Sequence, residues 1–466
     1  MPNKWRKRFE PENLTLCDVA CIYSTPDIIM KIFKEAVAEK EWLGRLAQWD
    51  LVDLVKSLLE TSELDEDALN YGFEQSLSYL ALCCLEILIE YATEHNIVFR
   101  ERHPFHLMYS TATSNCRIRS SYVECTRMLI KHGWSVKSAP SPLYSLIVAV
   151  KNMRESQRIC ADMTEDDHND FNHGDYEKMF LNYRIPLDCL EALLNAGADP
   201  NLKEKSDQPQ NDIKRKRNNS AAEALMTLLG DASLFETKDL WNFLSKAVVL
   251  LVEHGCDLSF VDENGQSFLH AAFHAISYSI AVNIECVAYI INGVLLSNFD
   301  EKEIDMMVET IKYAVKNGAD LHARDSNGCF PLVKFTESLK AMNAEINVVL
   351  QLVDREDECN IIWMHVIAQI KFFYDFLNVM DQVTAREIVE SSINIVQSNE
   401  IGFGLDSNGE QLLSLLRSYY PIRSLQSMCL LKVYHACKFQ PEKLEMFSNL
   451  YMQLFEGIFP TVVKKS

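Results

Sequence analysis

A glycine recurs shortly after an amphipathic run at four places in this chain, and this recurrence limits the folds open to it. The runs are Cys125–Lys131, Cys189–Asn195, Val248–Glu253 and Ile311–Lys316, and the glycines are Gly133, Gly197, Gly255 and Gly318. Apolar residues three or four positions apart predict a helix in each run. A glycine beyond a helix can take the left-handed conformation that satisfies the last carbonyl groups. We therefore predict an all-α protein of helices that end in sharp turns.

A second pattern follows two of these turns. Asp262–Gly265 and Asp325–Gly328 each have the Asp-Xaa-Asn-Gly form of a tight hairpin turn. A helix is predicted to begin directly after each turn, and the segment Ser141–Tyr144 has a similar opening. Ser or Thr can cap such a helix, and Pro suits its first position because no amide hydrogen is needed there. His132, His254 and His270 fall at positions where an imidazole can tie turns together by hydrogen bonds.

These ordered features resemble the ankyrin repeat. The resemblance implies an ankyrin-repeat solenoid over residues 46–418, preceded by an N-terminal helical cap over residues 1–45. The four glycines are separated by 64, 58 and 63 residues, whereas an ankyrin unit has about 33. Degenerate repeats could lie between the clear ones, or helices and loops could be lengthened. Polar inserts are predicted near residues 160–178 and 203–220, and a late copy of the turn at Asp406–Gly409.

The segment Ser424–Val433 has a docking pattern. In a helix, Leu425, Cys429 and Val433 recur at every fourth position and share one face. The segment resembles the Elongin C-binding helix of a SOCS box, which makes residues 421–466 a small SOCS-box-like helical tail. The resemblance implies contacts to Elongin C from Ser424, Leu425, Met428, Cys429 and Val433. The same face could instead pack onto the body of the protein.

A SOCS box usually closes with a Leu-Pro-aliphatic-Pro element that helps to select the cullin. The matching positions here are Ile458, Phe459, Pro460 and Val462, and only one proline is present. The resemblance therefore implies a cullin contact at this element while leaving open whether the tail makes it.

Together, the two resemblances imply the substrate-recognition subunit of a ubiquitin ligase that contains Elongin B, Elongin C, a cullin and a RING protein. The predicted contacts to a protein substrate lie on the hairpin turns: Asp262, Glu263, Asn264, Arg324, Asp325, Ser326 and Asn327. The alternative is an ankyrin scaffold or inhibitor without a ligase link. An F-box-like tail ranks below both, because its Leu-Pro helix start is missing.

Composition excludes several classes of function. The formal net charge of −21 disfavours nucleic acid and favours a basic protein partner. The 14 cysteines are scattered, without the spacing of a disulfide framework or a zinc site. No metal or cofactor is therefore expected.

The sequence also lacks a glycine-rich phosphate loop, a His-Glu-x-x-His motif and a Gly-x-Ser-x-Gly motif. We therefore expect an adaptor without catalytic residues of its own. No signal peptide is evident, and the longest uncharged stretch, Gln266–Ile284, contains polar residues unsuited to a membrane span. A cytoplasmic location is predicted, and the basic run Lys214–Arg217 fits either a surface loop or a nuclear import signal.

Overall fold

The computed structural model describes residues 21, 24–36, 39–61, 64–101, 103–111, 121–137, 140–165, 183–202, 220–230, 237–277, 301–338, 371, 374–380, 382–397 and 407–419. Within these residues the regular structure is helical, apart from one isolated antiparallel bridge between Val261 and Ser267. The predicted all-α class is confirmed. None of the described helices combines the length and apolar character needed to cross a bilayer.

The described residues form two compact units. The first comprises those up to Ala224 together with Glu253–Cys256, and the second comprises Leu225–Val252 and the described residues from Asp257 onward. Two of the three boundaries fall inside helices, because α11 (Ala221–Gly230) and α12 (Thr237–Glu253) each contribute residues to both units, and the third lies between Cys256 and Asp257.

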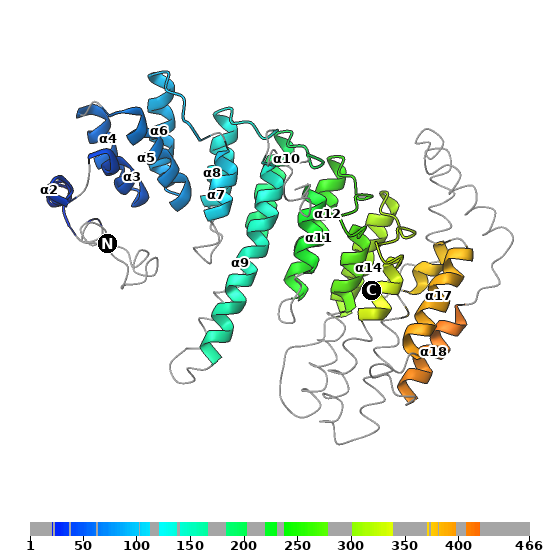
Figure 1. Ribbon diagram of the computed structural model, residues 1–466. Coiled ribbons are helices and arrows are strands. Elements are labelled where there is room, and N and C mark those ends of the chain that lie inside the picture. The colour runs from blue at the N-terminus through cyan, green and yellow to red at the C-terminus, as the bar shows by residue number, and fades with distance from the viewer. Residues whose placement is uncertain are drawn as a thin grey trace, which may run out of the picture. The chain divides into compact units, whose positions relative to one another are not determined.

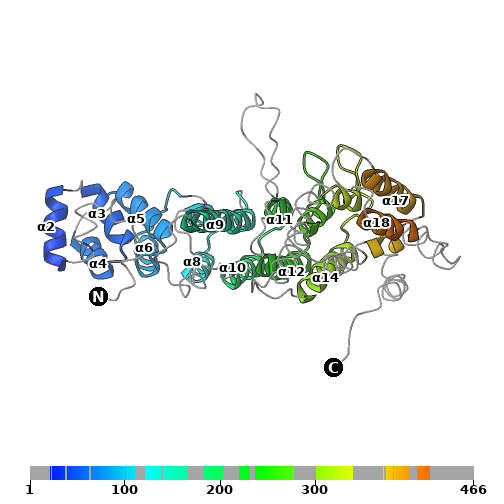
Figure 2. The same cartoon turned by 90° about the horizontal axis from the view of Figure 1, so that it is seen from below.

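The first unit is a two-layered stack of helix pairs. In one layer α3 packs on α5, α5 on α7 and α7 on α9, and in the other α4 packs on α6, α6 on α8 and α8 on α10. Figure 2 shows these helices as two adjacent rows. The helices are α2 (Pro26–Ala36), α3 (Glu39–Gln48), α4 (Val52–Thr61), α5 (Glu66–Tyr79), α6 (Leu82–Glu94), α7 (Pro104–Thr111), α8 (Ser121–Lys131), α9 (Pro142–Glu165) and α10 (Arg184–Asn195).

The core of this unit lies between the layers. Leu46, Phe73, Leu85, Leu129 and Leu193 are all buried there. Small residues let α3 and α5 approach closely: a methyl group at Gly44 would overlap the ring of Tyr71, and one at Gly72 would overlap the Leu43 side chain. Substitution of either glycine would therefore force the Tyr71 or Leu43 side chain, or the helices themselves, to shift.

The second unit has an aromatic core. Phe273 lies 5.9 Å from Phe335 and 6.1 Å from Phe376, measured between ring centroids, and Phe335 lies 6.0 Å from Tyr374. These rings come from helical residues 268–277 and 331–338 and from the segment that contains η4. The other elements are α14 (Glu301–Lys316), η4 (Asp375–Val379), α17 (Gln382–Gln397) and α18 (Ser407–Ser418).

Left-handed residues end the helices where the sequence predicts them. Gly133, Gly197, Gly255 and Gly318 have φ angles of 81°, 86°, 85° and 103°. After Gly133, Gly197 and Gly318 the next amide bonds back five residues, as from Ala198 N to the Leu193 carbonyl oxygen at 3.0 Å. This pattern closes the last helical turn and redirects the chain.

Three further helix ends use the same conformation without glycine. Asp50, Leu80 and Asn96 have φ angles of 54°, 55° and 55°, and each is followed by the same backward hydrogen bond. In one of them, Ile97 N donates to the Ala92 carbonyl oxygen at 2.8 Å. The glycine pattern misses these turns, although Asn at this position is a recognised signal.

One long helix accounts for part of the wide spacing between Gly133 and Gly197. Among the described residues, α9 and α10 lie between Gly133 and Gly197, and α11 and α12 lie between Gly197 and Gly255. Helix α9, with 24 residues, spans about 36 Å at 1.5 Å per residue and is the long cyan helix in Figure 1. Each of these two intervals therefore contains one helix pair within the described part.

The predicted late turn at Asp406–Gly409 is wrong where the structure describes it. Residues Ser407 to Gly409 form the first turn of α18, although the tetrapeptide is identical to Asp325–Gly328. The helix predicted after it is present, and Leu413 and Leu416 are buried. Of the predicted polar inserts, residues 160–165 belong to α9, and residues 166–178 and 203–219 lie outside the described residues.

Substitution at Gly318 tests the cost of the left-handed turn by itself. A methyl group there would meet no described atom within 4 Å, so only backbone strain changes. We expect Gly318→Ala to lower the free energy of unfolding by about 1–2 kcal/mol. Gly318→Asn should lower the free energy of unfolding by less, because Asn tolerates the left-handed conformation. Equilibrium urea unfolding measures both variants, and equal losses would contradict the account.

Candidate functional site: two stacked turns

The turn Asp262–Gly265 is organised by one carboxylate. Asp262 Oδ1 accepts hydrogen bonds from Asn264 N at 2.9 Å and from Gln266 N at 2.7 Å. Gly265 N donates to the Asp262 carbonyl oxygen at 3.0 Å, and Gly265 has a φ of 71°. The side chain of the first residue thus satisfies backbone amides that the tight turn leaves unpaired.

The turn Asp325–Gly328 repeats this geometry. Asp325 Oδ1 accepts from Asn327 N and from Cys329 N, both at 2.9 Å. Gly328 N donates to the Asp325 carbonyl oxygen at 2.9 Å, and Gly328 has a φ of 78°. Both predicted hairpin turns are therefore confirmed, with the Asp and Gly in the same roles.

A direct hydrogen bond stacks the second turn on the first. Ser326 N donates to the Asn264 carbonyl oxygen at 2.7 Å. A methyl group at Gly265 would lie 3.1 Å from Ser326 N and 3.2 Å from the Asp325 backbone, so the two turns are in contact. The tip residues predicted from the sequence are thus brought side by side in the second unit.

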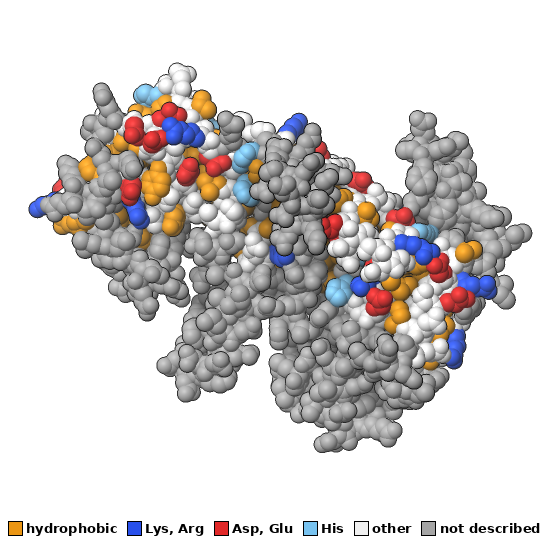
Figure 3. Space-filling view, viewed as in Figure 1, with side chains coloured by type: hydrophobic (Ala, Val, Ile, Leu, Met, Phe, Trp, Pro, Cys, Tyr) orange, Lys and Arg blue, Asp and Glu red, His pale blue; other side chains and the backbone are white. Residues whose placement is uncertain are grey.

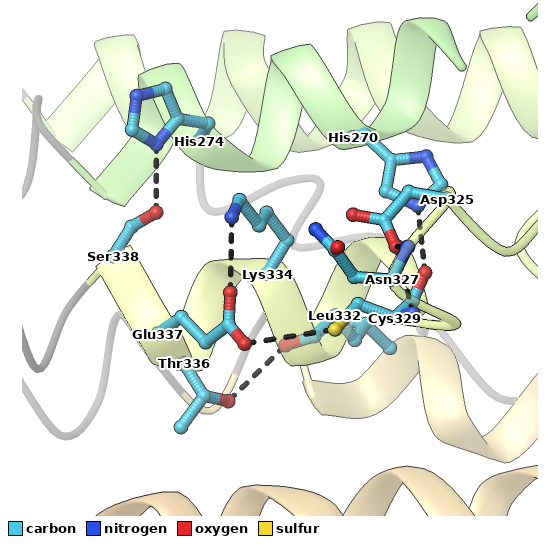
Figure 4. A network of polar contacts seen from close by, with 10 residues as sticks. All are labelled: His270, His274, Asp325, Asn327, Cys329, Leu332, Lys334, Thr336, Glu337 and Ser338. Atoms are coloured by element: carbon cyan, nitrogen blue, oxygen red, sulfur yellow. Dashed lines mark hydrogen bonds and ion pairs between the residues drawn. The ribbon is translucent and has the colours of Figure 1, made fainter. Parts of the chain in front are cut away.

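His270 braces the turns from inside. Its Nδ1 accepts from Ser267 N at 3.0 Å, so this nitrogen carries no proton, and its Nε2 donates to the Cys329 carbonyl oxygen at 3.0 Å (Figure 4). Burial lowers the pKa of His270 and favours the neutral ring that this pattern needs. The role predicted for His270 is confirmed.

The predicted contact residues differ in exposure. Glu263, Asn264, Ser326 and Asn327 are exposed, and Asp262 is partly exposed. Asp325 is only 6% exposed, and its Oδ1 holds the turn, so this side chain positions the tip from beneath rather than facing outward.

Arg324 links the second turn to α17. Its Nη2 donates to Glu387 Oε2 at 2.7 Å, and its guanidinium lies 4.2 Å from the centre of the Phe330 ring. Both charged side chains remain about half exposed, at 48% and 43%, so the pair orients Arg324 more than it stabilises the fold. Sequence reasoning missed Glu387, because it lies 63 residues from Arg324 with no local signal.

The thiols of Cys125, Cys189 and Cys329 are poorly suited to nucleophilic chemistry. Burial is the largest cause that raises the pKa of Cys329 to about 11 and the pKa values of Cys125 and Cys189 to about 12. The Cys329 thiol also donates to Glu337, whose other oxygen accepts from Lys334 at 3.0 Å. Among the described residues, no group of three or more His, Cys, Asp or Glu side chains could hold a metal ion.

Charges are mixed over the visible face of the molecule. Figure 3 shows Lys and Arg side chains interspersed with Asp and Glu across its described part. The net charge of −21 therefore does not translate into one acidic patch on the described part of that face.

The predicted tail contacts lie outside the described residues. This applies to the predicted Elongin C contacts Ser424, Leu425, Met428, Cys429 and Val433, and to the predicted cullin contacts Ile458, Phe459, Pro460 and Val462. Comparison of the sequence with protein-family models and with curated proteins finds no match.

The two turn glycines provide a matched test of stacking. Gly265→Ala and Gly328→Ala impose similar φ strain, but only the first adds a methyl group against backbone. We expect Gly328→Ala to cost about 1–2 kcal/mol of unfolding free energy and Gly265→Ala at least about 1 kcal/mol more. Urea unfolding measures the difference, and a larger loss for Gly328→Ala would show that the turns do not stack.

His270 should make stability depend on pH. The pKa of His270 in the folded protein is lowered from its ordinary value of 6.5. As pH falls, this residue therefore takes up its proton at a higher pH in the unfolded chain than in the folded protein. The free energy of unfolding should therefore fall as pH drops below about 6.5 and flatten below the folded pKa. His270→Gln removes this contribution and should reduce the slope between about pH 7 and pH 5. His274, whose pKa burial also lowers, remains as an internal reference. Urea midpoints across this range measure the slope, and an unchanged slope in His270→Gln would contradict the assignment.

Proposed function

We propose that the chain is a protein-binding adaptor of the ankyrin-repeat type. The observation that carries the proposal is the bond from Ser326 N to the Asn264 carbonyl oxygen at 2.7 Å, which stacks two turns of the same design. The layered helix pairs of the first unit and the left-handed helix ends support the same class. In this class, consecutive units present their turns along one surface.

The stacked turns suit recognition of another protein. Their backbones are fixed by Asp262, Asp325 and His270, so little conformational freedom remains to be lost on binding. Glu263, Asn264, Ser326, Asn327 and Arg324 offer exposed donors, acceptors and charges for a partner. Asp262 is partly exposed and could contact a partner at the edge of the turns, whereas the buried Asp325 holds the backbone of its turn in place.

We further propose that the adaptor serves as substrate receptor of a ubiquitin ligase built on Elongin B, Elongin C, a cullin and a RING protein. The pattern of Leu425, Cys429 and Val433 supports docking to Elongin C. Catalysis would then come from proximity, because holding a target lysine near a charged conjugating enzyme raises its effective concentration. The raised pKa values of Cys125, Cys189 and Cys329 make these three thiols poor candidates for a thioester. Such a complex would act in the cytoplasm, or in the nucleus if Lys214–Arg217 is an import signal.

Co-purification with Elongin B and Elongin C tests the ligase proposal. The double variant Leu425→Pro, Cys429→Phe breaks the helix and fills the small contact, so recovery of the Elongins should fall by about tenfold or more. Lys432 lies off the docking face of the expected helix. Lys432→Ala should therefore leave recovery of the Elongins unchanged and is the matched control. Quantitative mass spectrometry of the purified complex reports the ratio, and equal recovery by both variants would reject the docking assignment.

The alternative is a scaffold or inhibitor with no ligase link. The stacked turns support this alternative equally well, since they could bind a target protein whether or not the chain also binds Elongin C. Deletion of residues 421–466 separates the two: both functions keep target binding through the turns, but only the ligase receptor loses Elongin recovery and target ubiquitination.

A further inference from the structure

The two stacked turns both contain an Asn-Gly dipeptide, the sequence most prone to spontaneous loss of the asparagine side-chain amide. The chain has five such pairs, at Asn264, Asn292, Asn317, Asn327 and Asn408, and all except Asn292 lie in the described part. From their different surroundings, we infer that Asn327 is a site of spontaneous deamidation and that stacking protects Asn264. This inference does not depend on the proposed function.

The reaction needs a specific movement of the backbone. The backbone nitrogen of the glycine attacks the side-chain carbonyl carbon of the asparagine, ammonia leaves with the transferred proton, and a succinimide forms. Water then opens the ring to aspartate or isoaspartate. The glycine nitrogen can reach the side chain only if ψ of the asparagine rotates, and this rotation moves the asparagine carbonyl oxygen and the glycine nitrogen together, because the peptide group is planar.

At Asn264 this peptide group is held at both ends. Its oxygen accepts from Ser326 N at 2.7 Å, and Gly265 N donates to the Asp262 carbonyl oxygen at 3.0 Å. The backbone of Asp325 and Ser326 also lies against Gly265. Rotation would therefore break two hydrogen bonds and push the second turn away.

At Asn327 the same peptide group is held at one end. Gly328 N donates to the Asp325 carbonyl oxygen at 2.9 Å, as in the first turn, so this bond does not distinguish the two sites. No described residue donates to the Asn327 carbonyl oxygen, and no described atom would lie within 4 Å of a methyl group on Gly328. The difference between the sites is thus the hydrogen bond and contact that stacking supplies.

The other described pairs are restrained by helices. Asn317 Nδ2 donates to the Tyr313 carbonyl oxygen at 2.8 Å, which turns the side-chain amide back along α14. Asn408 and Gly409 lie in the first turn of α18, so cyclisation there would disrupt the start of that helix. Asn327 is therefore the described site with the fewest restraints on cyclisation.

Deamidation would alter the turn itself. The isoaspartyl product adds one methylene to the backbone between Asn327 and Gly328, next to the bonds that Asp325 Oδ1 accepts from Asn327 N and Cys329 N. Either product also places a new carboxylate at an exposed tip near Asp325. If the turns bind a target, as proposed above, target affinity should fall as the protein ages.

The first test uses the unmodified full-length protein. Folded protein is incubated at mildly alkaline pH, and deamidation at each asparagine is followed by peptide mass spectrometry, with a parallel sample in urea. In the folded protein, Asn327 should react about three- to tenfold faster than Asn264, the ratio expected from one hydrogen bond. In urea the two rates should converge. Equal rates in the folded protein, or the same ratio in urea, would overturn the inference.

The second test releases the protecting bond. Ser326→Pro removes the amide that donates to Asn264, and Pro is favoured at the second position of such a turn. Deamidation at Asn264 should rise toward the rate at Asn327, while the matched control Ser326→Ala keeps the amide and should leave it unchanged. Circular dichroism establishes that both variants are folded. An Asn264 rate unaffected by Ser326→Pro would show that this bond gives no protection.

Discussion

A left-handed residue just beyond a helix is the constraint on which the rest of this structure depends, and it ends seven of the described helices. It closes the last helical turn by a hydrogen bond to the carbonyl group five residues earlier, as at Ala198 and Ile97, and it sends the chain back for the next pair. Without it, the helices could not return at regular intervals. The described layers of the first unit and the two turns of the second unit both follow such ends.

In the loops beyond these helix ends, Asp carboxylates accept hydrogen bonds from nearby backbone amides. After the glycine, Asp199, Asp257 and Asp320 each accept from the amide two residues on, at 2.9 Å. Asp262 and Asp325 repeat the device and add a second amide. Short side chains thus satisfy the loop backbone locally, which leaves other groups at the tips available for a partner.

Much of this arrangement could be predicted from the sequence, because glycine and Asp-Xaa-Asn-Gly act through local geometry. Leu80 could not, since leucine rarely adopts the left-handed conformation, and Asp50 lacks the glycine on which the pattern was built. The identical tetrapeptides at Asp325 and Asp406 show the limit of local signals: the first forms a turn stacked on another, and in the second Ser407–Gly409 begin a helix. The partnership of Arg324 with Glu387 depends on tertiary packing and had no signal in the chain.

We propose that the stacked turns bind a target while residues 421–466 engage an adaptor. Hydrogen–deuterium exchange of the full-length chain with and without the Elongin B–Elongin C dimer tests it most directly. We predict slower exchange over residues 424–433 on addition of the dimer and unchanged exchange over residues 262–266 and 324–329. Protection of the turns by the dimer, or no protection of the tail, would contradict the division of the chain into these two surfaces.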